Sequence, residues 1–404
     1  MASKQIGCCP SCGKWSGSVK AYKKRKLQHY SIGGMDIKEY PVIVLRCGTE
    51  SCPKKTFTYQ VPVIGLEELE GRSRYTKSSK QFVVRKLLNE QISYNGFCKS
   101  IKADFGGQTS LSSLHRWAKE TVLEEVKLPL GEIKVLHTDE KHPSKKKRTS
   151  DKKYVIASAG RTDAAANSVA VHANLADSNS IEAITAHYQE LIDKGLDSEK
   201  VELVVTDMLA AYVSVIKTMF PNALHQICIF HLIQHLNKLF KAALKIHRYE
   251  HFKEGDRKEA HLIALLMLKG QEKLTEEEQQ KVQSFCDTYP DVAADYALKE
   301  DMRFLYAAAQ NLEQAVAYKD IIVETYTPKI SKEMEKAMLF FEQNFEQSIA
   351  YIKLSYIRDK TNNDAERMMR HIKRTQQTHY FLRDPKNYIR KVNVILGIRR
   401  PIAA

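Results

Sequence analysis

IKVLHTD (133–139) and VELVVTD (201–207) are two short apolar runs, and each ends in an aspartate. Runs of this composition predict β-strands. Further strands are expected from KYVIASAG (153–160), SVAVHANL (168–175) and ALHQICIF (223–230), and helices from 180–195 and 208–220. Three strands in succession, followed by alternating strands and helices, predict an α/β fold with a mixed sheet that carries helices on its faces.

The two aspartates, Asp139 and Asp207, are expected at one edge of that sheet, since α/β sites form at the carboxyl ends of neighbouring strands. A third carboxylate, Glu366, lies in NNDAERMMRHIKR (362–374), which predicts the start of a basic helix. Mg²⁺ prefers oxygen ligands, and two such ions about 4 Å apart can drive phosphoryl transfer. The three carboxylates therefore predict a two-metal site. The alternative is that both aspartates are ordinary turn residues and that the helix is a solvated one.

Two other acidic residues lie beside these candidates and are expected to face away from them. Glu140 follows Asp139 and would point to the opposite side of a strand. Asp364 precedes Glu366 by two positions and would lie on a different side of the helix.

The composition of the whole chain favours an anionic partner. Its 404 residues include 63 Lys and Arg against 48 Asp and Glu, a formal charge of +15 with a pI near 9.2. That excess favours nucleic acid, because each neutralised phosphate releases counterions. No apolar stretch approaches the ~20 residues of a membrane span, and the N-terminus lacks the apolar segment of a signal peptide. We therefore expect two or three domains and no membrane association.

Four cysteines near the N-terminus have the spacing of a structural zinc site. They form two close pairs: Cys9 with Cys12, and Cys47 with Cys52. Four thiolates in two close pairs can hold one Zn²⁺ tetrahedrally. We expect a zinc-ribbon domain over residues 1–65, in which Cys8 could take the place of Cys9. The alternative is a set of unrelated free thiols.

Residues 75–125 contain three amphipathic segments with short breaks, which predicts a helix-turn-helix domain. In that arrangement the third helix would enter the DNA major groove with Arg116 near its start. A generic three-helix packing module is the alternative.

Residues 239–350 are highly charged and have helical spacing throughout, which predicts an all-helical insertion.

One further motif, Cys228-x2-His231, follows the second aspartate by a single predicted strand. Together with HTDEKH, VVTDMLAAY and TNNDAERMMRHIK, it resembles the DDE transposases of prokaryotic insertion sequences. The resemblance is to the branch with an N-terminal zinc ribbon, a helix-turn-helix and a long helical insertion, and it covers essentially the whole chain.

The resemblance implies a ribonuclease H-like catalytic core formed by residues 130–238 and 351–400 and interrupted by the insertion. It implies that Asp139, Asp207 and Glu366 hold two Mg²⁺ or Mn²⁺ ions, while the zinc ion is structural. It also implies hydrolytic nicking at the element ends, followed by attack of the freed 3′-hydroxyl on target DNA. Both steps are in-line phosphoryl transfers that need no protein nucleophile.

The hypothesis of a transposase also sets the expected partners. These are DNA, as terminal inverted repeats and as target, and further copies of the chain in a homodimer or larger assembly in the prokaryotic cytoplasm, associated with the nucleoid. Cys228 and His231 are expected to be structural, although they could bind a metal. Basic residues expected to contact DNA are Arg116, Arg367, Arg370, Lys373 and Arg374. The alternatives are a non-catalytic DNA-binding regulator derived from a transposase and another ribonuclease H-like nuclease.

Overall fold

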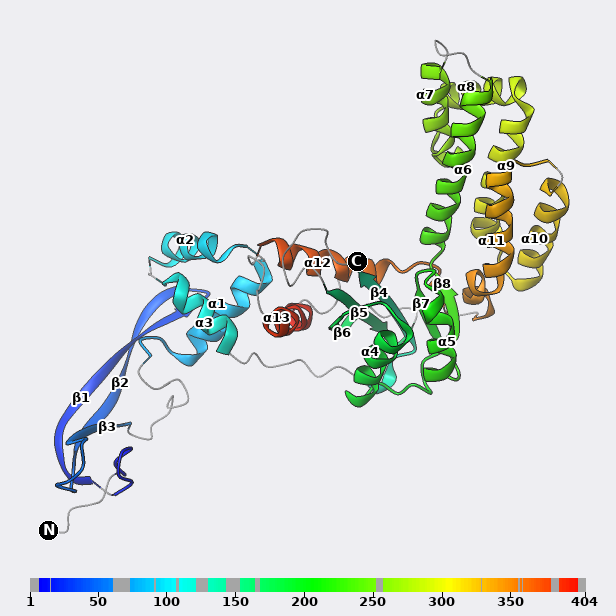
Figure 1. The fold of residues 1–404 in the computed structure, drawn as a ribbon. Helices are drawn as coiled ribbons and strands as arrows, with labels where there is room; N and C mark the ends of the chain where they lie inside the picture. Colours follow the sequence, from blue (N-terminus) through cyan, green and yellow to red (C-terminus); the bar gives the residue numbers. More distant parts are fainter. Residues whose placement is uncertain are drawn as a thin grey trace. The chain divides into compact units, whose positions relative to one another are not determined.

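The structure is a computed structural model, shown as a ribbon in Figure 1. It describes residues 7–14, 16–60, 73–90, 92–106, 109–120, 130–142, 153–163, 168–251, 257–327, 329–354, 357, 359–378 and 385–398. These residues fall into two compact units, one within Met1–Val126 and Arg374–Ile398, the other within Lys127–Lys373.

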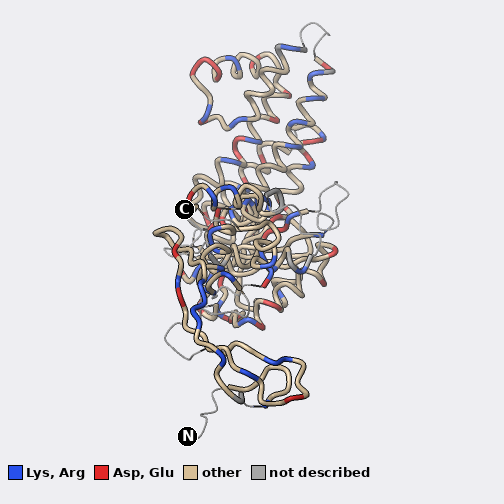
Figure 2. The backbone as a smooth tube through the Cα atoms, turned by 90° about the vertical axis from the view of Figure 1, so that its left-hand side faces the viewer, with Lys and Arg blue, Asp and Glu red and all other residues tan. Residues whose placement is uncertain are grey.

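The first unit begins with an antiparallel sheet in the order β1-β2-β3. Its strands are β1 (Ser16–Ser31), β2 (Gly34–Cys47) and β3 (Thr56–Gln60). The chain turns into β2 at Gly34, whose φ of 120° favours glycine because glycine has no Cβ. Figure 2 shows the Lys and Arg of the hairpin, where Glu39 of β2 pairs with Lys24 and Lys26 of β1.

Helices form the rest of the first unit: α1 (Lys77–Glu90), α2 (Tyr94–Phe105), α3 (Leu111–Glu120) and α13 (Pro385–Ile398). Ser93 caps α2 by accepting a hydrogen bond from the Gly96 amide, and Gly106, with a φ of 64°, ends the helix. Apolar side chains from all four helices share one core, among them Leu87, Phe97 and Trp117. The amphipathic spacing of 75–125 thus produces packed helices, as that pattern predicts.

Helix α13 groups with this first unit, although the sequence placed residues 351–400 with the catalytic core. Ile395 of α13 lies in the apolar core of the unit, and Lys391 donates a hydrogen bond to the Tyr94 hydroxyl of α2. Helical periodicity locates a helix but does not say against which unit it packs. The boundaries drawn from the sequence (1–65, 75–125, 130–238 with 351–400, and 239–350) remain predictions, and their ends at 61–65, 121–125 and 399–400 lie outside the described residues.

The second unit is built on a mixed sheet in the order β6-β5-β4-β7-β8. Strands β4, β5 and β6 are antiparallel neighbours, while β7 and β8 run parallel to β4. The strands are β4 (Val135–Lys141), β5 (Tyr154–Arg161), β6 (Val169–Ala176), β7 (Leu203–Thr206) and β8 (Leu224–Ile227). This order and these directions are those of a ribonuclease H-like core, and the predicted α/β fold with a mixed sheet is confirmed.

Successive side chains of the central strands point to opposite faces of this sheet, and both faces are covered by other parts of the chain. Leu136 and Val204 face helices α4 (Ile181–Asp193) and α5 (Ala210–Met219), whose apolar side chains complete one core. Val135 and Leu203 face the other side, where Ile357 covers them. Residues just after Ile357 lead into α12 (Asn363–Thr378), which carries the third candidate carboxylate.

The insertion that follows β8 is helical through its described residues (Figure 1). Its helices are α6 (Ile229–His251), α7 (Arg257–Met267), α8 (Glu276–Thr288), α9 (Pro290–Ala308), α10 (Leu312–Tyr326) and α11 (Lys332–Ser348), with short 3-10 turns at Gln271–Lys273 and Ala350–Lys353. They bury a core of their own, which includes Phe240, Leu298 and Phe341. The strand predicted over 223–230 is wrong at its end, because α6 already begins at Ile229. Among the described helices, none is both long and apolar enough to cross a lipid bilayer.

Candidate active site and DNA-binding surfaces

The register of the two central parallel strands brings Asp139 and Asp207 level with each other. Val135 of β4 pairs with Leu203 of β7, and His137 pairs with Val205, so equivalent positions differ by 205 − 137 = 68. The two aspartates differ by the same 207 − 139 = 68. Asp207 directly follows the last residue of β7, whereas Asp139 lies inside β4, which continues to Lys141. Adjacent strands therefore carry the two carboxylates to the same sheet edge.

Several negatively charged side chains lie close to Asp139. Burial and the charges of Glu140, Asp207 and Glu366 raise the pKa of Asp139 to about 7. A hydrogen bond from the Glu140 amide to Asp139 Oδ1 (2.9 Å) offsets only part of this rise. A carboxylate in such surroundings is destabilised until a cation neutralises its neighbours.

Glu366 reaches this edge because the residue before α12, Asn362, is bonded to β4 and to Cys228, which lies between β8 and α6. Its buried side-chain amide donates to the Thr138 carbonyl of β4 (2.7 Å), and its backbone N–H donates to Cys228 Sγ (3.2 Å). Its carbonyl accepts a hydrogen bond from the Glu366 amide (3.0 Å), and this bond closes the first turn of α12. The chain position of Asn362 thus determines where the helix that carries Glu366 begins.

Cys228 and His231 lie on the side of Glu366 that faces β8 and α6. His231 Nε2 is 3.8 Å from Glu366 Oε1, and the ligand atoms of Cys228, His231 and Glu366 all lie within 4.8 Å of one another. Cys228 is fully buried, and burial raises its pKa above the ordinary thiol value. Glu366 Oε1 is buried and makes no hydrogen bond, and His231 Nε2 is the nitrogen that lies beside it.

Asp364 is engaged elsewhere. It is 3% exposed and accepts hydrogen bonds from the Arg161 guanidinium, with Nε at 2.9 Å. Burial alone would raise the pKa of Asp364, but His137 and Arg161 hold it below its usual range. Its charge is therefore neutralised within the protein, unlike that of Asp139.

Glu140 is the residue near the site whose importance the sequence did not indicate. Its Oε2 accepts a hydrogen bond from the Tyr212 hydroxyl of α5 (2.6 Å), on the face opposite Asp139 that strand alternation predicts. Burial and the charge of Asp207 nevertheless raise the pKa of Glu140 to about 7. Glu140 thus adds negative charge to the site from behind the sheet. The adjacent acidic pair in HTDEK was the only sequence signal for this.

The four cysteines of the first unit meet as the paired spacing predicts. Cys9 Sγ is 3.8 Å from Cys52 Sγ, Cys12 Sγ is 3.5 Å from Cys47 Sγ, and all four sulfurs lie within 4.8 Å of one another. Tetrahedral Zn–S bonds of ~2.3 Å place thiolates ~3.8 Å apart, so this donor set fits zinc. The Lys14 backbone N–H and the Thr49 hydroxyl lower the pKa of the Cys12 thiol to about 6, which favours the thiolate. Cys8 is exposed and outside the cluster.

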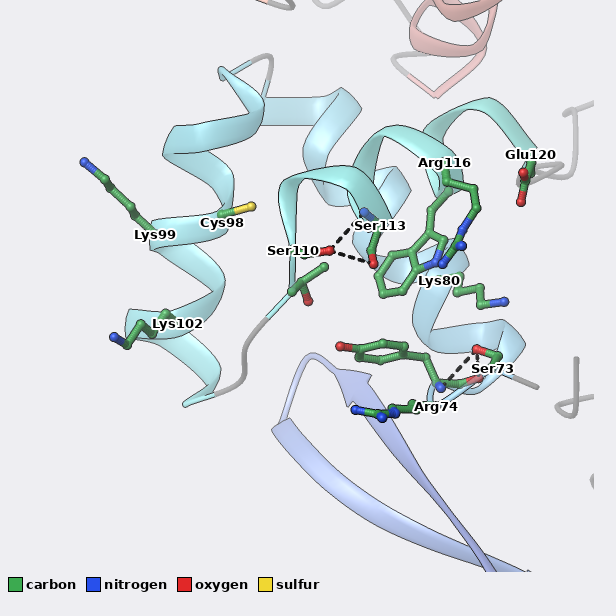
Figure 3. Close-up of a pocket in the computed structure, with 13 residues that line it drawn as sticks. Ser73, Arg74, Lys80, Cys98, Lys99, Lys102, Ser110, Ser113, Arg116 and Glu120 are labelled. Carbon is green, nitrogen blue, oxygen red and sulfur yellow. Dashed lines mark hydrogen bonds between the residues drawn. The ribbon is translucent and has the colours of Figure 1, made fainter. Parts of the chain in front are cut away.

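A basic hollow lies among the helices of the first unit (Figure 3). Its volume is about 950 Å³, and its rim combines five cations with one acid, Glu120. The cations are Arg74, Lys80, Lys99, Lys102 and Arg116. Ser110, which caps α3 through the Ser113 amide (3.1 Å), faces the same hollow. Exposed N–H groups at a helix start and surrounding cations suit an anionic ligand such as a DNA phosphate.

The basic residues predicted on α12 lie at different degrees of exposure. Arg370, Lys373 and Arg374 are exposed, and Arg370 follows Glu366 by one helical turn. Arg367 is half-buried, with Nη1 3.7 Å from Asp364 Oδ1.

Comparisons with known proteins address the family directly. A family model described as a transposase, of the DDE ISL3 type, matches residues 137–392. The chain is similar to a solved Drosophila P element transposase strand transfer complex, with 10% identity, a TM-score of 0.45 and coverage of 82% of this chain and 93% of that chain. That likeness is too weak to support an argument. No curated protein sequence matches. Since the family model spans well over half of the chain and includes all three candidate carboxylates, the chain belongs to the ISL3-type family of DDE transposases.

Proposed function

We propose that this DNA transposase cuts and joins DNA with Asp139, Asp207 and Glu366 as the ligands of two Mg²⁺ or Mn²⁺ ions. The observation that carries the proposal is the convergence of buried, uncompensated negative charge on Asp139. The three carboxylates offer oxygen ligands, which suit a hard divalent cation. When bound, such ions activate the attacking oxygen and stabilise the leaving one.

The protein residues supply placement and charge around that pair. Arg370 and Lys373 lie on the face of α12 that carries Glu366, where they can hold a substrate phosphate by charge-assisted hydrogen bonds. Asn362 keeps Glu366 at the sheet edge by bonding the β4 backbone. His231 faces Glu366 from α6, and we assign it and Cys228 a structural role in joining α6 to the α12 start.

The first unit is assigned to zinc binding and DNA recognition. We propose that the four-cysteine cluster holds one structural Zn²⁺ and that the helices with Arg116 read terminal inverted repeats. Two element ends must be brought together, so we propose a homodimer or larger assembly that acts on DNA in the cytoplasm of a prokaryote. Arg367 and Arg374 are assigned to DNA contact on the strength of their positions on α12.

The test uses Asp207→Asn and a matched variant, Asp177→Asn. Asp177 also follows a strand end, that of β6, but its side chain is 87% exposed and pairs with Lys153. Cleavage is measured on a duplex that contains the DNA flanking the gene. Mn²⁺ binding is measured separately by electron paramagnetic resonance. Asp207→Asn should lose both cleavage and Mn²⁺ binding, whereas Asp177→Asn should keep both.

Three results would contradict the proposal. Cleavage that survives in Asp207→Asn would remove this carboxylate from the site. Specific DNA binding by the wild type with no metal-dependent cleavage would favour the regulator. Cleavage without joining of a 3′-hydroxyl end to target DNA would favour another ribonuclease H-like nuclease.

A further inference from the structure

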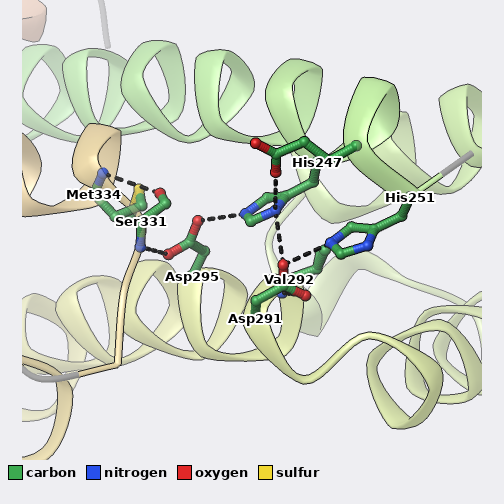
Figure 4. A network of polar contacts seen from close by, with 8 residues as sticks. His247, His251, Asp291, Val292, Asp295, Ser331 and Met334 are labelled. Atoms are coloured by element: carbon green, nitrogen blue, oxygen red, sulfur yellow. Dashed lines mark hydrogen bonds and ion pairs between the residues drawn. The ribbon is translucent and has the colours of Figure 1, made fainter.

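A second group of histidines and carboxylates lies in the helical insertion (Figure 4). His247 and His251 are one turn apart near the end of α6, and Asp291 lies in the first turn of α9. Asp291 Oδ2 is 3.1 Å from His247 Nδ1 and 2.6 Å from His251 Nε2. The ligand atoms of His247, His251 and Glu250 lie within 4.8 Å of one another. Two helices thus direct two imidazoles and one carboxylate, with Glu250 beside them, towards one point.

The buried residue Asp295 fixes the orientation of His247. Asp295 is fully buried, its Oδ2 is 3.0 Å from His247 Nε2, and its Oδ1 accepts the Ser331 amide (2.9 Å). A neutral imidazole that donates Nε2–H to a carboxylate has its lone pair on Nδ1. Metal-binding histidines in proteins are held in this way by a carboxylate behind the ring. His247 is 6% exposed, and its buried Nδ1 points into the cluster, with Asp291 Oδ2 at 3.1 Å and Glu250 Oε2 at 3.9 Å.

The other members of the cluster are accessible to an ion from solvent. The side chains of His251, Asp291 and Glu250 are 33%, 43% and 59% exposed. Two imidazoles and one or two carboxylates are a donor set for Zn²⁺ or a similar transition ion, with at least one position left for water. Mg²⁺ is a poorer fit, because it prefers oxygen ligands throughout.

We propose that His247, His251 and Asp291 form a binding site for a divalent transition metal, best suited to Zn²⁺, with Glu250 as an additional ligand and Asp295 as the residue that orients His247. The ion would fasten the end of α6 to the start of α9. The site is separate from the four cysteines and from the carboxylates of the sheet edge, and it does not depend on the reaction that the protein catalyses.

A metal-free ion-pair network is the rival explanation. Burial alone would lower the pKa of His247, but the hydrogen bond that it donates to Asp295 and the charges of Asp295, Asp291 and Glu250 raise this pKa above its ordinary value. A protonated His247 would pair with these carboxylates and bind no metal. The two explanations differ in whether the chain takes up an ion at these residues.

The experiment counts zinc on the full chain. Metal-stripped protein is dialysed against micromolar Zn²⁺ with millimolar Mg²⁺ present, and bound zinc is measured by mass spectrometry. We expect His251→Ala to bind one equivalent fewer than the wild type. His261→Ala, which removes an exposed histidine from the neighbouring helix α7, should bind the wild-type amount. Circular dichroism before zinc addition verifies that each variant is folded.

Two further variants test the geometry. Asp295→Asn places an amide N–H towards His247 Nε2, which moves the ring proton to Nδ1, and zinc affinity at this site should fall about 10- to 100-fold. His251→Cys should retain the equivalent and, with Co²⁺ in place of zinc, add a thiolate-to-metal absorption band to the wild-type spectrum. Equal zinc content in wild type and His251→Ala, or no added band in folded His251→Cys, would refute the site. Uptake of the extra equivalent only at millimolar zinc would refute it as well.

Discussion

Replacing Asp139 by asparagine should stabilise the second unit at pH 8 in the absence of divalent metal. Burial, with the charges of Glu140, Asp207 and Glu366, raises the pKa of Asp139 from 3.8 to about 7. A carboxyl group whose pKa is higher in the folded than in the unfolded chain favours folding when protonated, and this contribution is lost as the pH rises from about 4 through 7. A rise of about three units corresponds to about 4 kcal/mol. Asparagine cannot ionise, so the variant should recover about 2–4 kcal/mol of that loss at pH 8.

Asp364→Asn is the matched control, because it should act in the opposite direction. Asp364 is equally part of the second unit, but its charge is paired with Arg161, and its pKa lies below the usual range. Removing one member of a buried ion pair costs about 3–5 kcal/mol. We expect the lower end of that range, since Asp359 remains 3.3 Å from Arg161 Nη1.

The assay must report on the second unit alone. The chain has 2 tryptophans, Trp15 and Trp117, and both precede residue 127, so tryptophan fluorescence reports on the first unit. Amide hydrogen exchange of the central strand β7 reports the opening free energy of the second unit. At pH 8, Asp139→Asn should slow this exchange by about 30- to 10³-fold, because each 1.4 kcal/mol is a factor of ten.

Magnesium provides the second half of the test. An ion that binds the deprotonated carboxylates should stabilise the wild type and leave Asp139→Asn almost unchanged. The reasoning is refuted if Asp139→Asn accelerates β7 exchange as Asp364→Asn does, or if Mg²⁺ protects both variants and the wild type equally.

Other substitutions test the remaining parts of the structure. Asn362→Ala removes the hydrogen bond to the Thr138 carbonyl and should lower stability by about 0.5–1.5 kcal/mol. It should also lower cleavage by about 10²-fold through displacement of α12. Ala at the exposed neighbour Asn363 should change neither property, as measured by urea unfolding and single-turnover cleavage. Cys52→Ser should lower the zinc content by one equivalent in metal analysis, whereas Cys8→Ser should not. Arg116→Ala should weaken binding of end DNA and reduce the salt slope of the binding constant by about one, measured by fluorescence anisotropy against salt.

The sheet and its two aspartates could be anticipated because the required information is local. Each apolar run encodes a strand, and a shared offset of 68 residues aligns both the strand pairing and the two aspartates. The cysteine cluster is equally local, since each half is one turn with its own pair of thiols. The ends of elements do not follow from the local pattern alone. β4 extends past Asp139 to Lys141, and α6 begins within the stretch expected to be a strand.

Contacts between distant segments could not be read from the sequence. Asn362 bonds a residue 224 positions earlier, and nothing in a single asparagine indicates such a partner. The same holds for α13, whose amphipathic pattern fits any apolar surface, and for His247, whose partners Asp291 and Asp295 lie on another helix. The effect of Glu140 on Asp139 could not be read from the sequence either. Strand alternation gives its direction correctly, but charge acts through the sheet, so a residue on the far face still changes the pKa of Asp139.

Glu366 can lie at the sheet edge in spite of the long insertion, because the two ends of the insertion lie next to each other. The Ile229 amide, at the start of α6, donates a hydrogen bond to the carbonyl of Lys360, which lies two residues before Asn362 (2.9 Å). Two residues later Asn362 bonds both Cys228 and Thr138, so both ends of the excursion are fixed to the sheet. The closure entropy of a loop grows only with the logarithm of its length, so a long insertion costs little more than a short one once its ends are held. The position of Glu366 is therefore set where the two ends of the insertion meet, by the hydrogen bonds of Ile229 and Asn362.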